Sequence, residues 1–321
     1  MKSSFQKVFF TLLLAAGFSV FSYAQSVDAA GTALNEAIEF KKAKQYGKAA
    51  EAFEKALNIA SMAGPDAFSI QASAEKQLPL MYFYDAVSTY KAKDYIKAIE
   101  KFKKAANAGE KYNNPGITEK AGRNVTALNN SLGNSFRKKK EFDKALGYFN
   151  DAIEFDPGYA KAYLGKMLVY KDLGQDQKMI EMADKINSIE PDSKTASSAN
   201  GLIQTYYLKD AKLAHDSKKK AQAVESIESY LNYGIPTTQG LYMASVIYNA
   251  NDQFQKSIEM VNKALAKASD KKMIGNLYFE LGNAHKGLNN VEQACSAYSK
   301  ALDGPNGESA KYQMEEVIGC K

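Results

Sequence analysis

The sequence predicts an all-α fold, an α-solenoid of about seven helix-turn-helix repeats that ends in a C-terminal capping helix. Three observations predict this fold. Short segments occur in pairs, and each carries apolar residues at helical spacing on one face. Small residues recur at fixed places between the large apolar ones. The pattern repeats along the chain. Its shortest period is 34 residues, and the other periods are longer.

The stretch 132–157, LGNSFRKKKEFDKALGYFNDAIEFDP, shows the pattern most clearly. Its two halves each predict an amphipathic helix, and the polar run KKKE between them is long enough for a tight antiparallel turn. Gly133 and Ala145 predict a close approach of the two helices, because a larger side chain would hold the backbones apart. Pro157 ends the second helix, since proline cannot donate to the helix ladder.

The same device recurs along the chain. Each copy has an anchor in its second helix, an aromatic or apolar residue four positions later, and in most copies an alanine seven positions later. The anchors are Ala49, Ala98, Ala145, Met179, Ala223, Ser257 and Ala294. An aromatic or apolar residue marks the turn three positions earlier in most copies, at Tyr46, Tyr95, Phe142, Phe254 and Val291. The anchors are separated by 49, 47, 34, 44, 34 and 37 residues.

This pattern resembles the tetratricopeptide repeat family, whose 34-residue helix-turn-helix unit has L-G, Y, A-x3-F and P at fixed places. The best matches are Leu132-Gly133, Phe142, Ala145, Phe149, Ala152 and Pro157, then Tyr163, Tyr170, Gly174 and Pro191, and finally Tyr278, Leu281-Gly282, Ala294, Tyr298 and Ala301. The chain departs from the family pattern because it has no Trp. Its first two periods are also too long, which predicts longer helices or longer loops there.

The repeats are expected to form one elongated domain over residues 25–321, because each repeat of a solenoid contacts mainly its neighbours. The predicted repeats lie near 30–62, 79–110, 126–158, 160–192, 204–236, 238–270 and 275–304, with a capping helix over 308–321.

Residues 1–24 are expected to be a bacterial secretory signal peptide that is cleaved after Ala24. Lys2 and Lys7 precede an apolar run of about 14 residues, and Ser22-Tyr23-Ala24 offers small residues at the cleavage site. The alternative is a membrane anchor, but a spanning helix needs about 20 apolar residues. The expected location is therefore the periplasm or the exterior, without stable membrane insertion after cleavage.

The two cysteines lie late in the chain, Cys295 in the last repeat and Cys320 in the expected cap. In an oxidising compartment this placement favours a disulfide that fixes the cap to the last hairpin. The alternative is a pair of free thiols. The spacing is not C-x-x-C, which argues against a redox role.

No enzymatic motif is present. The sequence has no phosphate-binding glycine loop, no H-E-x-x-H and no G-x-S-x-G, and it has only His215 and His285 for metal or base chemistry. We therefore expect no catalytic residues, no metal and no cofactor. After signal cleavage the chain carries 40 basic and 36 acidic residues, a balance that does not indicate nucleic-acid binding.

The resemblance implies a concave groove lined by the first helix of each repeat. The groove residues that it implies are Lys41, Lys42, Phe83, Tyr90, Lys91, Asn130, Asn134, Arg137, Lys138, Leu168, Lys171, Tyr242, Asn249, Phe279, Asn283 and Lys286. Basic residues recur there between tyrosines and phenylalanines, which favours an extended peptide or an acidic segment as the partner. The alternative is that these lysines are ordinary solvated helix ends.

Three classes of function remain open. The leading one is a non-enzymatic periplasmic or secreted scaffold that binds protein or peptide segments in its groove, in envelope assembly or secretion. The second is an accessory protein that binds carbohydrate in a surface uptake system, which the 20 Tyr and 16 Phe permit and the missing Trp weakens. The third is an enzyme. The sequence does not indicate the partner or the oligomeric state.

Overall fold

The computed structural model describes residues 26–320, and this part of the chain is helical throughout, with no strand. The expected signal peptide lies outside the described residues. Contacts divide the chain into two compact units, Met1–Val169 and Tyr170–Lys321. None of the helices in the described range is both long and apolar enough to cross a membrane.

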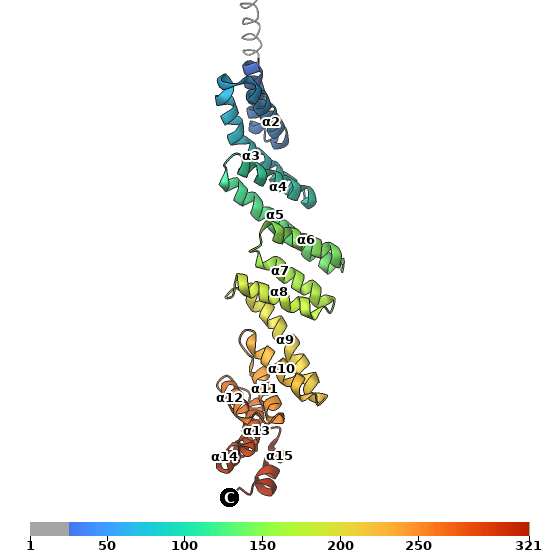
Figure 1. Ribbon diagram of the computed structural model, residues 1–321, viewed down its shortest axis with the longest axis vertical. Coiled ribbons are helices and arrows are strands. Elements are labelled where there is room, and N and C mark those ends of the chain that lie inside the picture. Colours follow the sequence, from blue (N-terminus) through green and yellow to red (C-terminus); the bar gives the residue numbers. More distant parts are fainter. Residues whose placement is uncertain (1–25, 321) are drawn as a thin grey trace, which may run out of the picture. The chain divides into compact units, whose positions relative to one another are not determined.

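The first unit is built from antiparallel helices that follow one another along the chain (Figure 1). In order they are a helix over residues 26–42, α2 (Tyr46–Ala63), the short 3-10 turn η1 (Pro65–Ala67), α3 (Phe68–Lys91), α4 (Tyr95–Lys111), α5 (Pro115–Lys138), α6 (Phe142–Phe155) and α7 (Ala160–Asp172), which crosses into the second unit.

The second unit repeats the arrangement. Its helices are α8 (Asp176–Ile189), α9 (Lys194–Asp216), α10 (Lys220–Asn232), α11 (Thr238–Ala250), α12 (Phe254–Leu265), α13 (Lys271–Gly287), α14 (Val291–Ala301) and α15 (Gly307–Tyr312), followed by the π turn η2 (Gln313–Val317). α9 packs on α10, α11 on α12, and α13 on α14. The first helices α9, α11 and α13 also contact one another in sequence, so they form a row.

The helix pairs follow the predicted pattern. All five residues predicted to mark the turn are the first residues of second helices, namely of α2, α4, α6, α12 and α14. All seven anchors are buried, none more than 2 % exposed. Six of the turns place a non-glycine residue at positive φ, at Lys44, Lys93, Lys140, Lys218, Asp252 and Asn289, and Gly174 takes this role between α7 and α8.

The extra length of the first two periods lies in helices. α3 and α5 have 24 residues each, whereas α7 has 13. α3 begins at Phe68, well before the start predicted for the second repeat, and α2 continues to Ala63. The helices of this region are therefore extended at their ends, and α3 packs against both α2 and α4.

Small residues make room for buried rings, as the sequence indicates. A Cβ added to Gly133 on α5 would lie 2.7 Å from the Phe149 ring, and one added to Gly165 on α7 would lie 2.2 Å from it. The Phe149 side chain on α6 is fully buried. One ring of α6 therefore fills the space that two glycines leave open on the neighbouring helices.

The C-terminal cap packs against the last hairpin. Ala310 on α15 is buried in a cluster with Ala294, Tyr298 and Ala301, and Met314 and Ile318 cover it. A disulfide joins Cys295 to Cys320, with their Cα atoms 5.7 Å apart, which confirms the predicted pairing.

Candidate functional site

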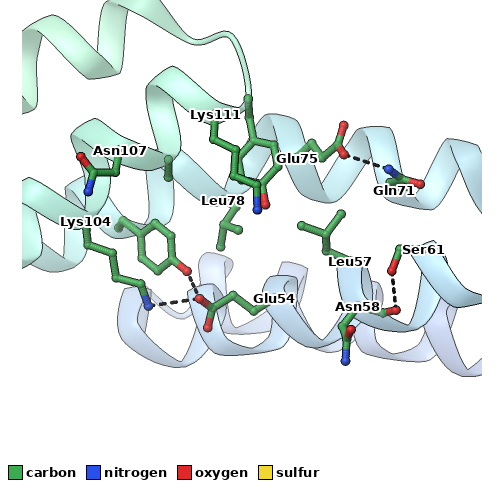
Figure 2. A pocket seen from close by; sticks show the side chains of 13 residues that line it. Glu54, Leu57, Asn58, Ser61, Gln71, Glu75, Leu78, Lys104, Asn107 and Lys111 are labelled. Carbon is green, nitrogen blue, oxygen red and sulfur yellow. Dashed lines mark hydrogen bonds and ion pairs between the residues drawn. The ribbon is translucent and has the colours of Figure 1, made fainter.

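An open groove lies over α2, α3 and α4 in the first unit, and we call it the α2–α4 groove (Figure 2). Its volume is about 600 Å³. The lining residues are Glu54, Leu57, Asn58 and Ser61 of α2, Gln71, Glu75, Leu78 and Tyr82 of α3, and Lys104, Asn107, Ala108, Lys111 and Tyr112 of α4 and its C-cap. Each helix contributes residues three or four positions apart, so each presents one face to the groove.

The floor of the groove is apolar. Leu78 and Ala108 are buried, and Leu57 and Tyr112 are half-buried beside them. The lining extends past the predicted repeats, because Leu78 and two further residues of α3 precede residue 79. The groove therefore depends on the helix extensions, which a regular 34-residue repeat does not have.

One residue from each helix meets at an end of the groove. The Tyr82 hydroxyl donates to a carboxylate oxygen of Glu54, and the Lys104 ammonium lies 3.1 Å from the same carboxylate. The ammonium also lies 4.2 Å from the centre of the Tyr82 ring, within the range of a cation–π contact. Burial and the Glu54 carboxylate raise the pKa of Tyr82, so the phenol stays a hydrogen-bond donor. The three side chains hold α2, α3 and α4 in register.

The rim carries both charges and amides. Gln71 donates to Glu75 at 2.9 Å (Figure 2). The Lys111 ammonium lies 5.0 Å from the centre of the Tyr112 ring. The Asn58 and Asn107 side chains are exposed on opposite walls. A primary amide offers both donors and an acceptor, so these two residues can pair with a peptide group in either direction.

The implied concave residues lie elsewhere. In the first unit, Lys41 donates to Gln77 at 2.7 Å and Lys42 pairs with Glu39. Phe83 is half-buried against Phe102. The remaining implied residues of the first unit are exposed at Tyr90, Lys91 and Lys138, and half-buried at Asn130, Asn134, Arg137 and Leu168.

In the second unit, Lys171 is exposed, and Phe279 is half-buried against Tyr298. Lys286 donates to Gln313 at 2.8 Å, which ties α13 to the C-terminal cap. The implied lysines thus lie on several different helices, and the contacts of Lys41, Lys42 and Lys286 are separate ones.

Three implied residues of the second unit do meet, around a residue that the sequence analysis did not select. Glu280 of α13 is 7 % exposed, and its carboxylate accepts from Asn249 at 2.7 Å and from Asn283 at 3.3 Å. The Tyr298 hydroxyl donates to the Asn283 carbonyl oxygen at 2.8 Å and so orients that amide. The Tyr242 phenol lies close to the Glu280 carboxylate. Burial and this negative charge both raise the pKa of Tyr242.

Burial raises the pKa of Glu280 above its ordinary value, while the two asparagines and His215 act in the opposite direction. A carboxyl group whose pKa is raised by folding stabilises the fold fully below the unfolded pKa, about 4.3. That contribution is lost as the pH rises through the folded value. Ionised Glu280 is therefore a cost at neutral pH.

We expect Glu280→Gln to raise the free energy of unfolding at pH 7 by on the order of 1 kcal/mol, because the amide keeps an acceptor for Asn249 without a buried charge. This gain in the free energy of unfolding should become smaller as the pH falls toward 4. Thermal unfolding followed by circular dichroism at pH 4, 5.5 and 7 measures it, and Glu292→Gln, at an exposed carboxylate, is the matched control. A gain that does not change with pH would contradict this account.

The comparison with protein families agrees with the repeat pattern. The tetratricopeptide repeat family model matches residues 275–303, which hold most of α13 and all of α14. The last hairpin of the chain is therefore similar to a tetratricopeptide repeat. The hairpins of the chain pack consecutively within each unit, as expected for the predicted all-α solenoid. No curated protein matches this chain.

Several solved structures are similar over much of the chain. The crystal structure of MamA protein is 18 % identical, covers 61 % of this chain and 97 % of its own, and has a TM-score of 0.34. A tetratricopeptide repeat protein from Parabacteroides merdae is 15 % identical, covers 88 % and 96 %, and has a TM-score of 0.28. The TPR2AB domain of yeast Sti1 in complex with pHSP90 is 15 % identical, covers 90 % and 95 %, and has a TM-score of 0.34.

The described part of the chain has no group of three or more His, Cys, Asp or Glu side chains placed to hold a metal ion. The sequence analysis did not predict the residues of the α2–α4 groove, because the family pattern implies binding residues on the first helix of each repeat. The available signal was the excess length of the first two periods.

Proposed function

We propose that this chain is a non-enzymatic scaffold of the bacterial periplasm or exterior that binds a segment of a partner protein in the α2–α4 groove. The observation that carries the proposal is an apolar floor beneath a rim of amides and charges of both signs. An apolar side chain of the partner would fill the space above Leu57 and Leu78, and its backbone would pair with Asn58 and Asn107. Lys2, Lys7 and the apolar run after them support an exported location.

The chemistry of the groove supports a polypeptide rather than a small anion. Its charged residues include Glu54 and Glu75 as well as Lys104 and Lys111, so a segment with both charges fits better than one with a single sign. Apolar anchors supply most of the binding energy in such contacts, while charges at the rim select the partner.

The test places a benzophenone amino acid at Asn107 in the full chain and irradiates cells that export it. The matched control carries the same group at Asn150, which is exposed on α6 outside the groove. We expect a discrete partner to be crosslinked from Asn107 and not from Asn150. The crosslinked segment should contain an apolar residue flanked by charges.

A synthetic peptide of that segment should then bind the purified chain. We expect Leu57→Gln or Lys111→Glu to weaken the binding of the peptide roughly tenfold, the equivalent of about 1.4 kcal/mol of binding free energy. Lys120→Glu, an exposed lysine outside the groove, should leave binding unchanged. If Lys138→Glu together with Lys171→Glu abolished binding while the groove variants did not, the implied concave face would be the site and the α2–α4 groove would be excluded.

A further inference from the structure

A polar pocket lies in the second unit, where α9 packs against both α8 and α10, and we call it the α8–α10 pocket. Its volume is about 610 Å³, within the range of small-molecule sites. All but one of the lining residues carry a side chain that forms hydrogen bonds. They are Asp184 and Asn187 of α8, Pro191 in the connection to α9, Asn200 and Tyr207 of α9, Ser229 and Asn232 of α10, and Tyr233, the C-cap of α10.

Tyrosine rings lie next to one another at this pocket. The Tyr207 and Tyr233 rings are nearly parallel, at an angle of 27° with their centres 6.0 Å apart. The Tyr206 ring packs against Tyr207, with the centres 5.2 Å apart. Tyr207 and Tyr233 are half-buried and both line the pocket, so part of each ring is open to a ligand. Such a ring offers a flat apolar face and loses little conformational entropy on binding.

The polar groups of the pocket are held in place by one another. The Tyr233 hydroxyl donates to the Asp184 carboxylate at 2.7 Å, which joins the end of α10 to α8. Burial and this carboxylate raise the pKa of Tyr233, so the phenol stays a donor at neutral pH. The Asn187 amide donates to the Asn200 carbonyl oxygen at 2.8 Å. These bonds leave the second Asp184 oxygen, the Asn187 carbonyl oxygen and the Asn200 amide hydrogens for a ligand.

A buried donor beside the pocket is unsatisfied. The Gln204 amide nitrogen is buried and has no hydrogen-bond partner within the described residues. Gln204 follows Asn200 by one turn of α9, and its nitrogen would lie 3.9 Å from a Cβ added to Gly234, the residue after Tyr233. A buried donor without a partner costs free energy. An acceptor oxygen of a ligand would therefore be favoured at this wall of the pocket.

We propose that the α8–α10 pocket binds a neutral carbohydrate, with the C–H face of one pyranose ring against the tyrosine rings and its hydroxyl groups paired with the carboxylate and the amides. The C–H groups on one face of a pyranose make that face apolar, so it packs on an aromatic ring. Its hydroxyl groups both donate and accept, as the primary amides do, and a carboxylate accepts strong hydrogen bonds from hydroxyl groups. This site is separate from the α2–α4 groove and does not rest on the function proposed there.

The lining favours a neutral sugar over an anion or an apolar side chain of a peptide. Asp184 is the one charged side chain among the described residues that line the pocket, so no cation there would compensate an anionic ligand. Pro191 is the one lining residue without a polar side chain. An apolar side chain would therefore bury little apolar surface against the pocket, and most of the polar groups would lose water without a new partner.

The probes are maltose, cellobiose and N,N′-diacetylchitobiose, which are neutral disaccharides with different linkages and substituents. Saturation-transfer difference NMR with the full chain detects their binding. We expect at least one of them to bind with a dissociation constant on the order of 1 mM, because hydroxyl groups exchange water for protein partners with a small net gain. Its ring C–H protons should receive the strongest saturation. Acetyl-Gly-Asn-Gly-amide is the peptide probe. No binding of any disaccharide, or binding of the peptide alone, would overturn the proposal.

Variants at the rim and at the ring locate the site. Asn232 is exposed, and Asn232→Ala should weaken the bound disaccharide several-fold. Asn262→Ala, at an exposed asparagine of α12 outside the pocket, is the matched control and should leave binding unchanged. Tyr233→Leu should abolish the signal, whereas Tyr233→Phe keeps the ring and should retain part of it.

Circular dichroism verifies that each variant is folded. If Tyr233→Leu unfolds the chain, the comparison of Asn232→Ala with Asn262→Ala decides. A disaccharide that binds the folded rim and ring variants as it binds the wild-type chain would lie elsewhere, and the α8–α10 pocket would be excluded as its site.

Discussion

Phe149→Ala is expected to destabilise the first unit by about 3–5 kcal/mol, the range for truncating a buried phenylalanine. The ring is fully buried between helices, and two glycines border it. Its removal leaves a cavity that the surrounding backbone cannot fully close. The measurement is thermal and urea unfolding followed by circular dichroism. Phe68→Ala is the control, since that side chain is 62 % exposed and should change stability by little.

A substitution at Gly165 tests the prediction for Phe149 further. In the wild-type chain Gly165→Ala should cost about 1–3 kcal/mol, because the added methyl group overlaps the Phe149 ring. In the Phe149→Ala background the same methyl group enters the cavity and should cost much less. The coupling of the two substitutions should therefore be about 1 kcal/mol or more. Additive effects would show that the ring and Gly165 do not share the space.

Loss of the disulfide is expected to weaken the C-terminal cap by about 3 kcal/mol on the chain-entropy account of a closed loop of this length. The bond spans 25 residues between Cys295 and Cys320. The variant is the double replacement Cys295→Ser with Cys320→Ser. Amide hydrogen exchange over residues 305–320 measures the effect, and exchange there should become much faster.

Treatment with a reductant is the control for the prediction on the disulfide. Dithiothreitol should make the wild-type cap exchange like the double variant, and it should leave the double variant unchanged. The packing of Ala310 against Tyr298 remains possible in both, so the hairpin α13–α14 should keep most of its protection. A cap that exchanges equally slowly with and without the bond would mean that packing alone holds it.

The repeat pattern predicted the fold because its signal lies in buried positions. The anchors and the first residues of the second helices follow from packing rules, and the structure confirms both sets. Cys295 and Cys320 could also be paired from sequence, because only two cysteines are present and the cap must lie against the last repeat.

The candidate site could not be predicted in the same way. Excess length before residue 79 is compatible with a loop or with a longer helix, and the α2–α4 groove exists only because α2 and α3 are extended as helices. Glu280 was missed because an acidic residue in a helix is usually solvated. Its buried carboxylate is satisfied by Asn249, 31 residues earlier in the chain, which donates to it. Such partners depend on tertiary packing and not on periodicity.

The short turns at positive φ also affect how the chain reaches its native state. Lys93 and Lys140 are two such positions, and each joins helices that are neighbours both in sequence and in space. Contacts of this kind keep the contact order low, which favours rapid folding because little loop entropy is lost before the contacts form. Each hairpin can therefore serve as a nucleus during synthesis, before the next hairpin has left the ribosome.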